Sequence, residues 1–256
     1  MPLDIPRSPE EIAAIHRTRK RLAVGRARQA PLLRDRLAGV DVGRLDDPEE
    51  WRKIPILTKD ELRRVPVPEF HAQFCIQDRA AVLEYWRSGG VTGQPLFYPR
   101  SAEDMEYALL AFRRIWPRIG ATPADTVHVS FPLGIHPVGH AIARSAQLEG
   151  LGVVWAGSGT STPSAMQLEL IQTLRPTIWA GMSSYCLHLA NLAEAGGIDL
   201  AQSSVRTVLV SAEPLTRAKR AKIERVWGAR VHDSFGMTEA SMISVEEVKK
   251  LREAAK

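Results

Sequence analysis

Short apolar runs alternate with stretches of helical periodicity over most of the chain beyond residue 80. Runs that predict strands stand at residues 81–86, 96–98, 126–130, 151–155, 177–180, 205–210 and 230–232. Apolar positions three and four residues apart predict helices at 102–119, 138–150, 163–174, 185–195 and 216–227. Strands separated by helices in this way are typical of a largely parallel sheet covered on both faces, so the predicted fold class is α/β.

The first 80 residues predict helices joined by short extended pieces. Ser8 and Pro9 stand at the start of a helix with acidic residues in its first turn, and the helical pattern continues to about Arg28. Thr58 is placed to cap a later helix.

Three parts follow from these patterns. We expect residues 1–80 to form a helical segment that packs on a core, and residues 81–243 to form that core as an α/β unit. Residues 244–256 predict a final helix, with Ser244 as its N-cap and Glu247 completing a capping box.

The formal net charge of +5 is concentrated in one segment. Residues 17–36 hold eight Lys or Arg against one acid, Asp35, which gives a local excess of +7. Such a segment is a candidate for contact with nucleic acid or a membrane surface. No aromatic residue lies among these charges, as a base-stacking surface requires. The pattern therefore favours a solvated amphipathic helix with Ile12, Ile15 and Leu22 on its inner face, and argues against a nucleic-acid partner.

The sequence also indicates the cellular compartment. No apolar run approaches the roughly 20 residues that a membrane helix needs, and the first residues lack the apolar segment of a secretory signal. The two cysteines, Cys75 and Cys186, are too few and too far apart for a disulfide framework or a zinc site. We therefore expect a cytoplasmic protein without a membrane contact, and the sequence leaves a homodimer open.

Three predicted loops have the composition of a site for a phosphate-bearing ligand, and such ligands bind at the carboxyl ends of the strands in open α/β sheets. The first loop is Ser-Gly-Gly-Val-Thr-Gly-Gln-Pro at residues 88–95. Its glycines allow backbone amides to turn toward one anion, and Ser88 and Thr92 add hydroxyl donors. The alternative is a tight hairpin between two strands, since the Gly-Lys-Ser/Thr of nucleoside triphosphatase loops is absent.

The other two loops follow strands nearer the C-terminus. Ser-Ala-Glu-Pro at residues 211–214 comes after an apolar strand, where a Glu-Pro pair could also simply start the next helix. His-Asp-Ser-Phe-Gly-Met-Thr-Glu at 232–239 combines an aromatic ring for a base, a hydroxyl for a phosphate and a carboxylate for a divalent cation. Its alternative is a turn followed by a capped helix. Gly-Ser-Gly at 157–159 also follows a strand, but Thr162 stands where a dinucleotide fingerprint has its third glycine, which excludes that motif.

The order and the residues of the three motifs resemble those of the adenylate-forming superfamily, which includes acyl-CoA synthetases, luciferases and peptide-synthetase adenylation domains. The likeness is greatest to its phenylacetate–CoA ligase branch, whose phosphate loop reads Ser-Ser-Gly-Thr-Thr-Gly-Lys-Pro. The branch's Gly-Ala-Glu-Pro appears as SAEP at 211–214, and its Tyr-Gly-Met/Leu-Thr/Ser-Glu appears as FGMTE at 235–239. The segments IPILTKDELR and TVHVSFPLGIHPVGH are also similar to this branch, so the resemblance spans residues 26–242.

The resemblance implies activation of a carboxylic acid, of the aromatic kind, by ATP and Mg²⁺, with transfer of the acyl group from the acyl-adenylate to coenzyme A. The chain would be the N-terminal large-domain portion of such a ligase, with residues 81–243 as its nucleotide- and acid-binding core. Thr238, on the α-phosphate, and Glu239, on Mg²⁺, would be the catalytic residues. The same resemblance assigns the phosphates to Ser88, Gly89, Gly90, Thr92 and Gly93, and the AMP moiety to Ala212, Glu213, Pro214, Asp233, Ser234, Phe235, Gly236, Met237 and Thr238.

The pocket for the acid is implied in the segment 131–139, with Tyr185 nearby. Phe131 matches the aromatic residues that enclose an aryl acid in the branch, and Gly139 lies in the same segment. His136 stands where an apolar aromatic residue is usual, so it is either a polar residue at the pocket rim or a hydrogen-bond partner for a polar group of the substrate. A zinc site at His136 and the nearby His140 is not expected, because no third ligand lies close by.

The sequence departs from the family's pattern in two ways. Val91 replaces a hydroxyl residue and Gln94 replaces the usual lysine, so the phosphate loop loses a positive charge. The pattern also stops after Met242, before the ribose-binding aspartate, the hinge and the small C-terminal domain with its catalytic lysine. We therefore expect that the chain alone does not complete thioester formation. The alternative function is a catalytically degenerate module that binds a small molecule or nucleotide without turnover.

Overall fold

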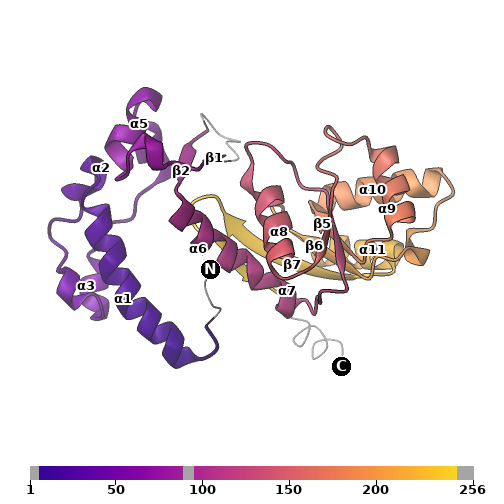
Figure 1. Ribbon diagram of the computed structural model, residues 1–256, viewed down its shortest axis with the longest axis horizontal. Helices are drawn as coiled ribbons and strands as arrows, with labels where there is room; N and C mark the ends of the chain where they lie inside the picture. Colours follow the sequence, from indigo (N-terminus) through magenta and orange to yellow (C-terminus); the bar gives the residue numbers. More distant parts are fainter. Residues whose placement is uncertain (1–5, 89–94, 247–256) are drawn as a thin grey trace. The chain divides into compact units, whose positions relative to one another are not determined.

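The computed structural model of the chain describes residues 6–88 and 95–246, which divide into two compact units (Figure 1). Among these residues, the helical unit comprises 6–85 and 95–102, and the sheet unit comprises 86–88 and 103–246. No helix in the described residues is both long and apolar enough to cross a membrane.

The helical unit begins with α1 (Pro9–Ala27), which starts where the sequence predicts. The Ser8 hydroxyl accepts the Glu11 N–H at 3.2 Å, and proline occupies the first turn. Thr58 and Glu61 form a capping box on a later helix. The remaining elements of this part of the chain are α2 (Pro31–Arg34), η1 (Val42–Arg44), α3 (Pro48–Arg52), α4 (Lys59–Arg63), α5 (Val67–Phe74), η2 (Arg79–Ala81), and the two-stranded sheet of β1 (Glu84–Arg87) and β2 (Phe97–Arg100).

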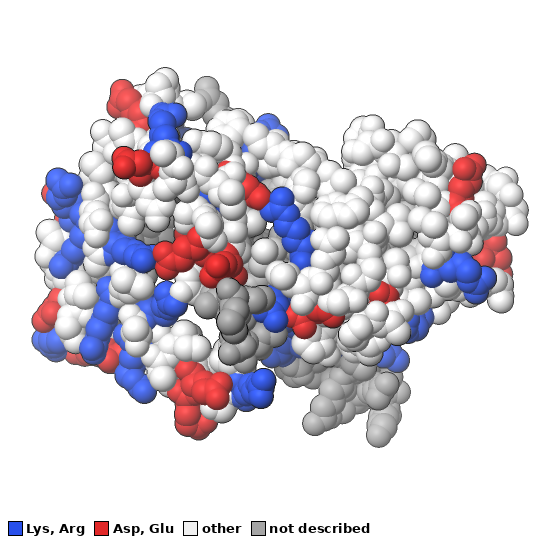
Figure 2. Space-filling model, viewed as in Figure 1, with Lys and Arg blue, Asp and Glu red and all other residues white. Residues whose placement is uncertain are grey.

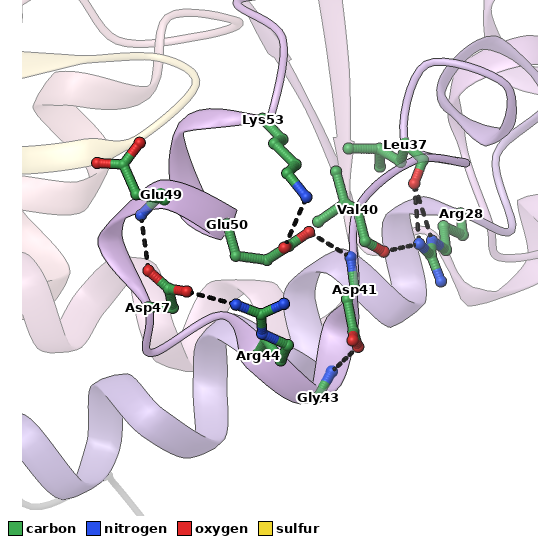
Figure 3. Close-up of polar contacts among 10 residues, drawn as sticks. All are labelled: Arg28, Leu37, Val40, Asp41, Gly43, Arg44, Asp47, Glu49, Glu50 and Lys53. Carbon is green, nitrogen blue, oxygen red and sulfur yellow. Dashed lines mark hydrogen bonds and ion pairs between the residues drawn. The ribbon is translucent and has the colours of Figure 1, made fainter.

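Buried polar contacts hold the turns of this unit (Figure 3). The carboxylate of Glu50, which is 2% exposed, accepts hydrogen bonds from the Asp41 N–H at 2.7 Å and from Lys53 Nζ at 2.9 Å. These two hydrogen bonds lower the pKa of Glu50. Arg28 donates to two backbone carbonyl groups in the segment 37–40, so its guanidinium ties the end of α1 to the chain that follows α2.

The basic residues of segment 17–36 lie among acidic partners. Arg21 pairs with Asp46 at 2.7 Å, and Arg36 pairs with Glu61 at 2.6 Å. Figure 2 shows Lys and Arg side chains interspersed with Asp and Glu over the visible face of this unit. The local charge excess is therefore partly neutralised by residues outside the segment.

The prediction of which residues form the inner face of α1 is partly wrong. Ile15 is 43% exposed and Leu22 is 38% exposed, whereas the buried residue of the helix is Val24. Val24 belongs to a small apolar cluster with residues from the segment 37–45. Among the residues of α1, those that join this cluster lie near the end of the helix, so Ile15 and Leu22 remain in contact with solvent.

The sheet unit is built on six strands, in the order β4-β3-β5-β6-β7-β8 among the described residues. Neighbouring strands from β4 to β7 are parallel, and β8 is antiparallel to β7. The mostly parallel sheet confirms the predicted α/β class. The strands are β3 (Thr126–Val129), β4 (Gly152–Trp155), β5 (Ile178–Gly181), β6 (Thr207–Val210), β7 (Arg230–Met237) and β8 (Ser241–Val245).

Helices cover both faces of this sheet (Figure 1). Ala180 of β5 and Leu209 of β6 belong to the core cluster formed with α6, α7 and α8. Their chain neighbours, Trp179 and Val210, belong to the other cluster, formed with α9, α10 and α11. This alternation is the two-residue period of a strand buried on both faces. The helices are α6 (Ala102–Arg113), α7 (Ile115–Arg118), α8 (Pro137–Leu148), α9 (Ser164–Leu174), α10 (Ser183–Ala195) and α11 (Arg217–Trp227), with a 3₁₀ turn η3 (Leu200–Gln202).

Two predicted elements differ from the structure. The helix predicted at 102–119 is interrupted at Arg114, because Pro117 lacks an N–H and its ring would meet the carbonyl of Arg113 in a continuous helix. The strand predicted at 230–232 continues to Met237, since its second half pairs with β8. Ser244 consequently lies within β8 and does not cap a helix. Residues 247–256 lie outside the described residues.

Candidate functional site

The predicted site segments follow the carboxyl ends of neighbouring parallel strands. Val129 of β3 is in register with Ala180 of β5. One residue further along, Gly181 of β5 is in register with Val210 of β6, which is in register with Asp233 of β7. Segments that leave the sheet beyond this level therefore share one edge of it. These segments are 131–139 after β3, the first turn of α10 with Tyr185 after β5, 211–214 after β6 and the end of β7 from 234 onward.

The chain that leads into the predicted phosphate loop is attached to the same edge. The backbone N–H of Arg87, at the end of β1, donates to the carbonyl of Ile135 at 3.1 Å. Ser88, the next residue, is 5% exposed. The other predicted phosphate-binding residues, Gly89, Gly90, Thr92 and Gly93, lie outside the described residues, as do Val91 and Gln94.

The second and third motifs are hydrogen-bonded to each other. The Ser211 hydroxyl donates to the carbonyl of Ser234 at 2.7 Å, and the Ser234 hydroxyl donates to the carbonyl of Val210 at 3.0 Å. Both serines are buried. Ala212 has a φ of 70°, a left-handed conformation that is costly for a residue with a Cβ. This conformation turns the chain sharply and leaves Ala212 and Pro214 exposed at the sheet edge.

Glu213 binds the beginning of α10. Its carboxylate accepts hydrogen bonds from the Ser184 N–H at 2.8 Å, the Ser184 hydroxyl at 2.5 Å and the Ser183 hydroxyl at 2.9 Å. Lys219 Nζ lies 3.5 Å from the same carboxylate. Burial acts to raise the pKa of Glu213, but the hydrogen bonds from the two serines and the charge of Lys219 outweigh it and lower the pKa. The carboxylate of the second motif is therefore anchored within the protein.

The third motif lies on a β-hairpin rather than before a helix. Phe235 is 60% exposed and Met237 is 43% exposed, so both present apolar surface to solvent. A Cβ on Gly236 would lie 2.7 Å from the Ser241 carbonyl oxygen, so only glycine fits where β7 approaches β8. Thr238 and Glu239 occupy the turn between the two strands and are half-buried.

A charged cluster at the start of this hairpin was not predicted from the sequence. The carboxylate of Glu246, which follows β8, accepts hydrogen bonds from Arg220 Nη2 on both oxygens, at 2.8 and 2.7 Å. It also accepts a hydrogen bond from the Asp233 N–H at 3.0 Å. Arg220, on α11, also donates to the carbonyl of Val231 at 2.6 Å. Burial and the nearby Glu246 charge raise the pKa of Asp233. The cluster ties α11, β7 and the residue after β8 together, and it includes Asp233 of the third motif.

The predicted acid-binding residues fall into different environments. Phe131 has no exposed surface and belongs to the core cluster, so its ring is not accessible to a ligand in this structure. Gly139 is also buried, and a Cβ there would lie 2.7 Å from the Pro132 carbonyl oxygen. His136 is half-buried at the N-cap of α8. Close packing against the segment 131–133 thus accounts for the glycine in the first turn of α8.

Tyr185 is half-buried in the first turn of α10, at the sheet edge. Its hydroxyl lies 3.0 Å from Ser164 Oγ, at the start of α9. Its ring stacks on His188 with 5.8 Å between the ring centres. Tyr185 therefore borders the loop that follows β4 as well as the segment after β5.

The fold is similar to that of solved acyl-CoA ligase structures. Solved structures of 2-hydroxyisobutyryl-CoA ligase, one in the postadenylation state with 2-HIB-AMP and one with 2-HIB-AMP and CoA in the thioesterification state, both superpose with a TM-score of 0.82 at 23% identity. Each comparison covers 91% of this chain and 50% of the other. At this identity the likeness concerns the fold.

Residues 21–256 match the AMP-binding enzyme family, and the chain belongs to that family. The match extends on both sides of residues 26–242, so the expectation that the family's pattern stops after Met242 is wrong. Phenylacetate–coenzyme A ligase of Escherichia coli K12 is 27% identical over 237 residues, which cover 91% of this chain and 52% of the relative. The Pseudomonas putida phenylacetate–coenzyme A ligase is 29% identical over 212 residues, covering 82% of this chain and 46% of the relative. The chain thus spans about half the length of the curated relatives it matches.

Proposed function

We propose that this chain holds ATP and a carboxylic acid at the carboxyl edge of its sheet and forms the acyl-adenylate, releasing pyrophosphate. One observation carries the proposal: four segments distant in sequence gather at one sheet edge, with Ser88 beside them. Three of these segments contain residues of the motifs that relate the chain to AMP-binding enzymes, and the fourth contains Tyr185. Membership of that family and the phenylacetate–CoA ligases among its relatives support an aromatic acid as substrate and coenzyme A as acceptor.

The side chains of the third motif fit a nucleotide. Phe235 offers an aromatic face that the protein itself leaves largely uncovered, and such a ring binds a purine base by stacking. Thr238 and Glu239 in the hairpin turn supply a hydroxyl and a carboxylate. A carboxylate together with phosphate oxygens is the donor set that Mg²⁺ prefers, so Glu239 would hold the cation that neutralises the phosphates.

The protein's own contribution to the reaction is positioning. The acid's carboxylate attacks the α-phosphorus, and pyrophosphate leaves from the opposite side. Thr238 would hold the α-phosphate by a hydrogen bond, and the 88–93 segment would hold the phosphates that leave. Orienting both reactants at one edge removes much of the entropic barrier of a bimolecular step. Glu213 would act through the backbone, because its carboxylate is already bound to the start of α10.

A module that binds nucleotide without turnover is the second candidate. It is favoured by Gln94 and Val91, which remove a positive charge and a hydroxyl from the phosphate segment. The two candidates agree on ATP binding and differ in pyrophosphate release.

Pyrophosphate release therefore tests the proposal. The purified chain is incubated with ATP, Mg²⁺ and each of a panel of aromatic and aliphatic acids. We expect acid-dependent pyrophosphate release that falls at least about a hundredfold in Glu239→Gln, in line with the loss of one charge-stabilising group. Glu169→Gln, an exposed position on α9, is the matched control and should retain full activity. ATP binding without release for any acid would support the second candidate and contradict acid activation.

A further inference from the structure

A buried carboxamide joins a core strand to the loop that follows β4. Gln167 lies on α9 with no exposed surface. Its Nε2 donates to the carbonyls of Gly157 at 2.9 Å and Thr162 at 3.2 Å. Its Oε1 accepts the Ser130 hydroxyl at 2.7 Å and lies 3.2 Å from His128 Nε2. One side chain thus contacts both ends of the loop 157–162 and the end of β3.

The orientation of this amide is fixed by its partners. Two carbonyl oxygens can only accept, so the NH₂ group must face the loop and the oxygen must face β3. His128 must then carry its proton on Nε2 in order to donate to that oxygen. Burial lowers the pKa of His128 to about 4, which keeps the ring neutral at neutral pH. All four hydrogen-bonding positions of the amide are occupied, so a rotation would cost several contacts together.

The loop held by Gln167 packs against predicted acid-binding segments. A Cβ on Gly157, which has a φ of 72°, would lie 3.3 Å from Leu133 Cδ1. A Cβ on Gly159 would lie 3.0 Å from the Tyr185 hydroxyl. The loop therefore fits closely between the segment after β3 and the first turn of α10.

We propose that Gln167 is a positioning residue for the acid site, because it fixes the loop 157–162 as the wall of that site beside Leu133 and Tyr185. This inference rests on the proposed function, since it assigns part of the acid pocket. Gln167 does not touch the acid. It acts through the backbone of the loop, and through that backbone it sets the size of acid that the pocket accepts.

Two measurements on Gln167→Glu test this role. The variant retains the oxygen that faces β3 and loses at least one of the two donors to the loop carbonyls. We expect the KM for the acid to rise roughly tenfold, the size of effect that one or two lost buried hydrogen bonds produce, while the KM for ATP stays within about twofold. Amide hydrogen exchange in the loop 157–162 should accelerate by a similar factor in the absence of ligand.

Two further variants separate the loop from the rest of the network. Ser130→Ala removes a contact on the β3 side without touching the loop carbonyls, and should leave the acid KM nearly unchanged. Gly157→Ala disturbs the loop directly, because its Cβ would lie 2.9 Å from Ser161 Cβ, and should raise the acid KM even if Gln167→Glu does not fold.

The results distinguish this inference from the proposed function. Faster exchange in the loop with an unchanged acid KM would overturn the positioning role while leaving acid activation intact. Equal losses for acid and ATP would indicate a general structural role and would also overturn it. A wild-type chain that activates no acid would instead refute the proposed function, and with it any acid pocket beside the loop.

Discussion

The backbone N–H of Arg87 donates to the carbonyl of Ile135 at 3.1 Å, and this bond joins the end of β1 to the loop after β3. Ser88 and the glycine-rich segment follow directly in the sequence. The hairpin with Thr238 and Glu239 extends from β7, three strands away in the same sheet. The arrangement brings the chain before the first motif and the third motif to the same edge, as the proposed nucleotide site requires.

Replacing Phe235 with Ala should weaken ATP binding without weakening the fold. The ring is 60% exposed, so its removal costs little folding free energy, whereas a lost stacking contact costs about 1–3 kcal/mol of binding. We expect the Kd for ATP to rise about 5- to 150-fold, with a melting temperature close to that of the wild type. Ile243→Ala, at an exposed position on β8, is the control. A Phe235→Ala variant that binds ATP normally would remove the ring from the site.

Glu213→Gln should destabilise the chain at neutral pH. The change removes the charge that the start of α10 and Lys219 both favour, at a cost of about 1–2 kcal/mol in the free energy of unfolding. Because the pKa of Glu213 is lowered in the fold, its ionised form contributes stability above the unfolded value near 4.5, and this contribution disappears as the pH falls. Urea unfolding of both proteins at pH 7 and pH 4 measures the difference. A difference that grows toward acid pH would contradict the anchoring role.

Asp125→Asn should lower stability and spare the site. Asp125 lies at the opposite edge of the sheet, before β3, where it is 1% exposed and accepts hydrogen bonds from Thr122 and Thr177. Its ion pair with Arg206 and these hydrogen bonds outweigh burial and lower its pKa to about 2. Their loss should cost about 2–4 kcal/mol. Calorimetry should find an unchanged Kd for ATP at a temperature where the variant is folded.

His128 should make the fold sensitive to mild acid. A buried histidine whose pKa falls from 6.5 to about 4 binds its proton more weakly in the folded state than in the unfolded state. Stability present at pH 7 is therefore lost as the pH falls from about 6.5 toward 4, by about 3 kcal/mol over that window. His128→Gln should show a shallower dependence. Because His232 titrates in both proteins, the difference between the two curves isolates His128. Parallel curves would contradict the shift.

The sequence predicted the alternation of strands and helices because both faces of the sheet are apolar and the helices that cover it carry apolar positions at helical spacing. It missed contacts that depend on pairing. The segment 234–237 contains polar and glycine residues that suggest a loop, but its pairing with β8 makes it a strand. The acidic residues after Ser244 suggest a helix start, whereas Glu246 binds Arg220. Long-range ion pairs of this kind leave no periodic signal.

The type of a residue in the sequence did not by itself reveal its role in the structure. Gly139 and Gly236 stand where a side chain would collide with backbone, a requirement that the sequence alone does not reveal. Phe131 has the chemistry of a pocket residue and the burial of a core residue. Gln167 belongs to none of the three motifs, and its role depends on partners 37 and 39 residues away in the sequence.

Backbone amide chemical shifts during titration with ATP and Mg²⁺ test the central claim most directly. The account predicts saturable shifts at Ser88 and in the segments 211–213 and 234–239, and none around Asp125 at the opposite edge of the sheet. Shifts confined to that opposite edge, or an unchanged spectrum at saturating ATP, would contradict a nucleotide site at the carboxyl ends of the strands.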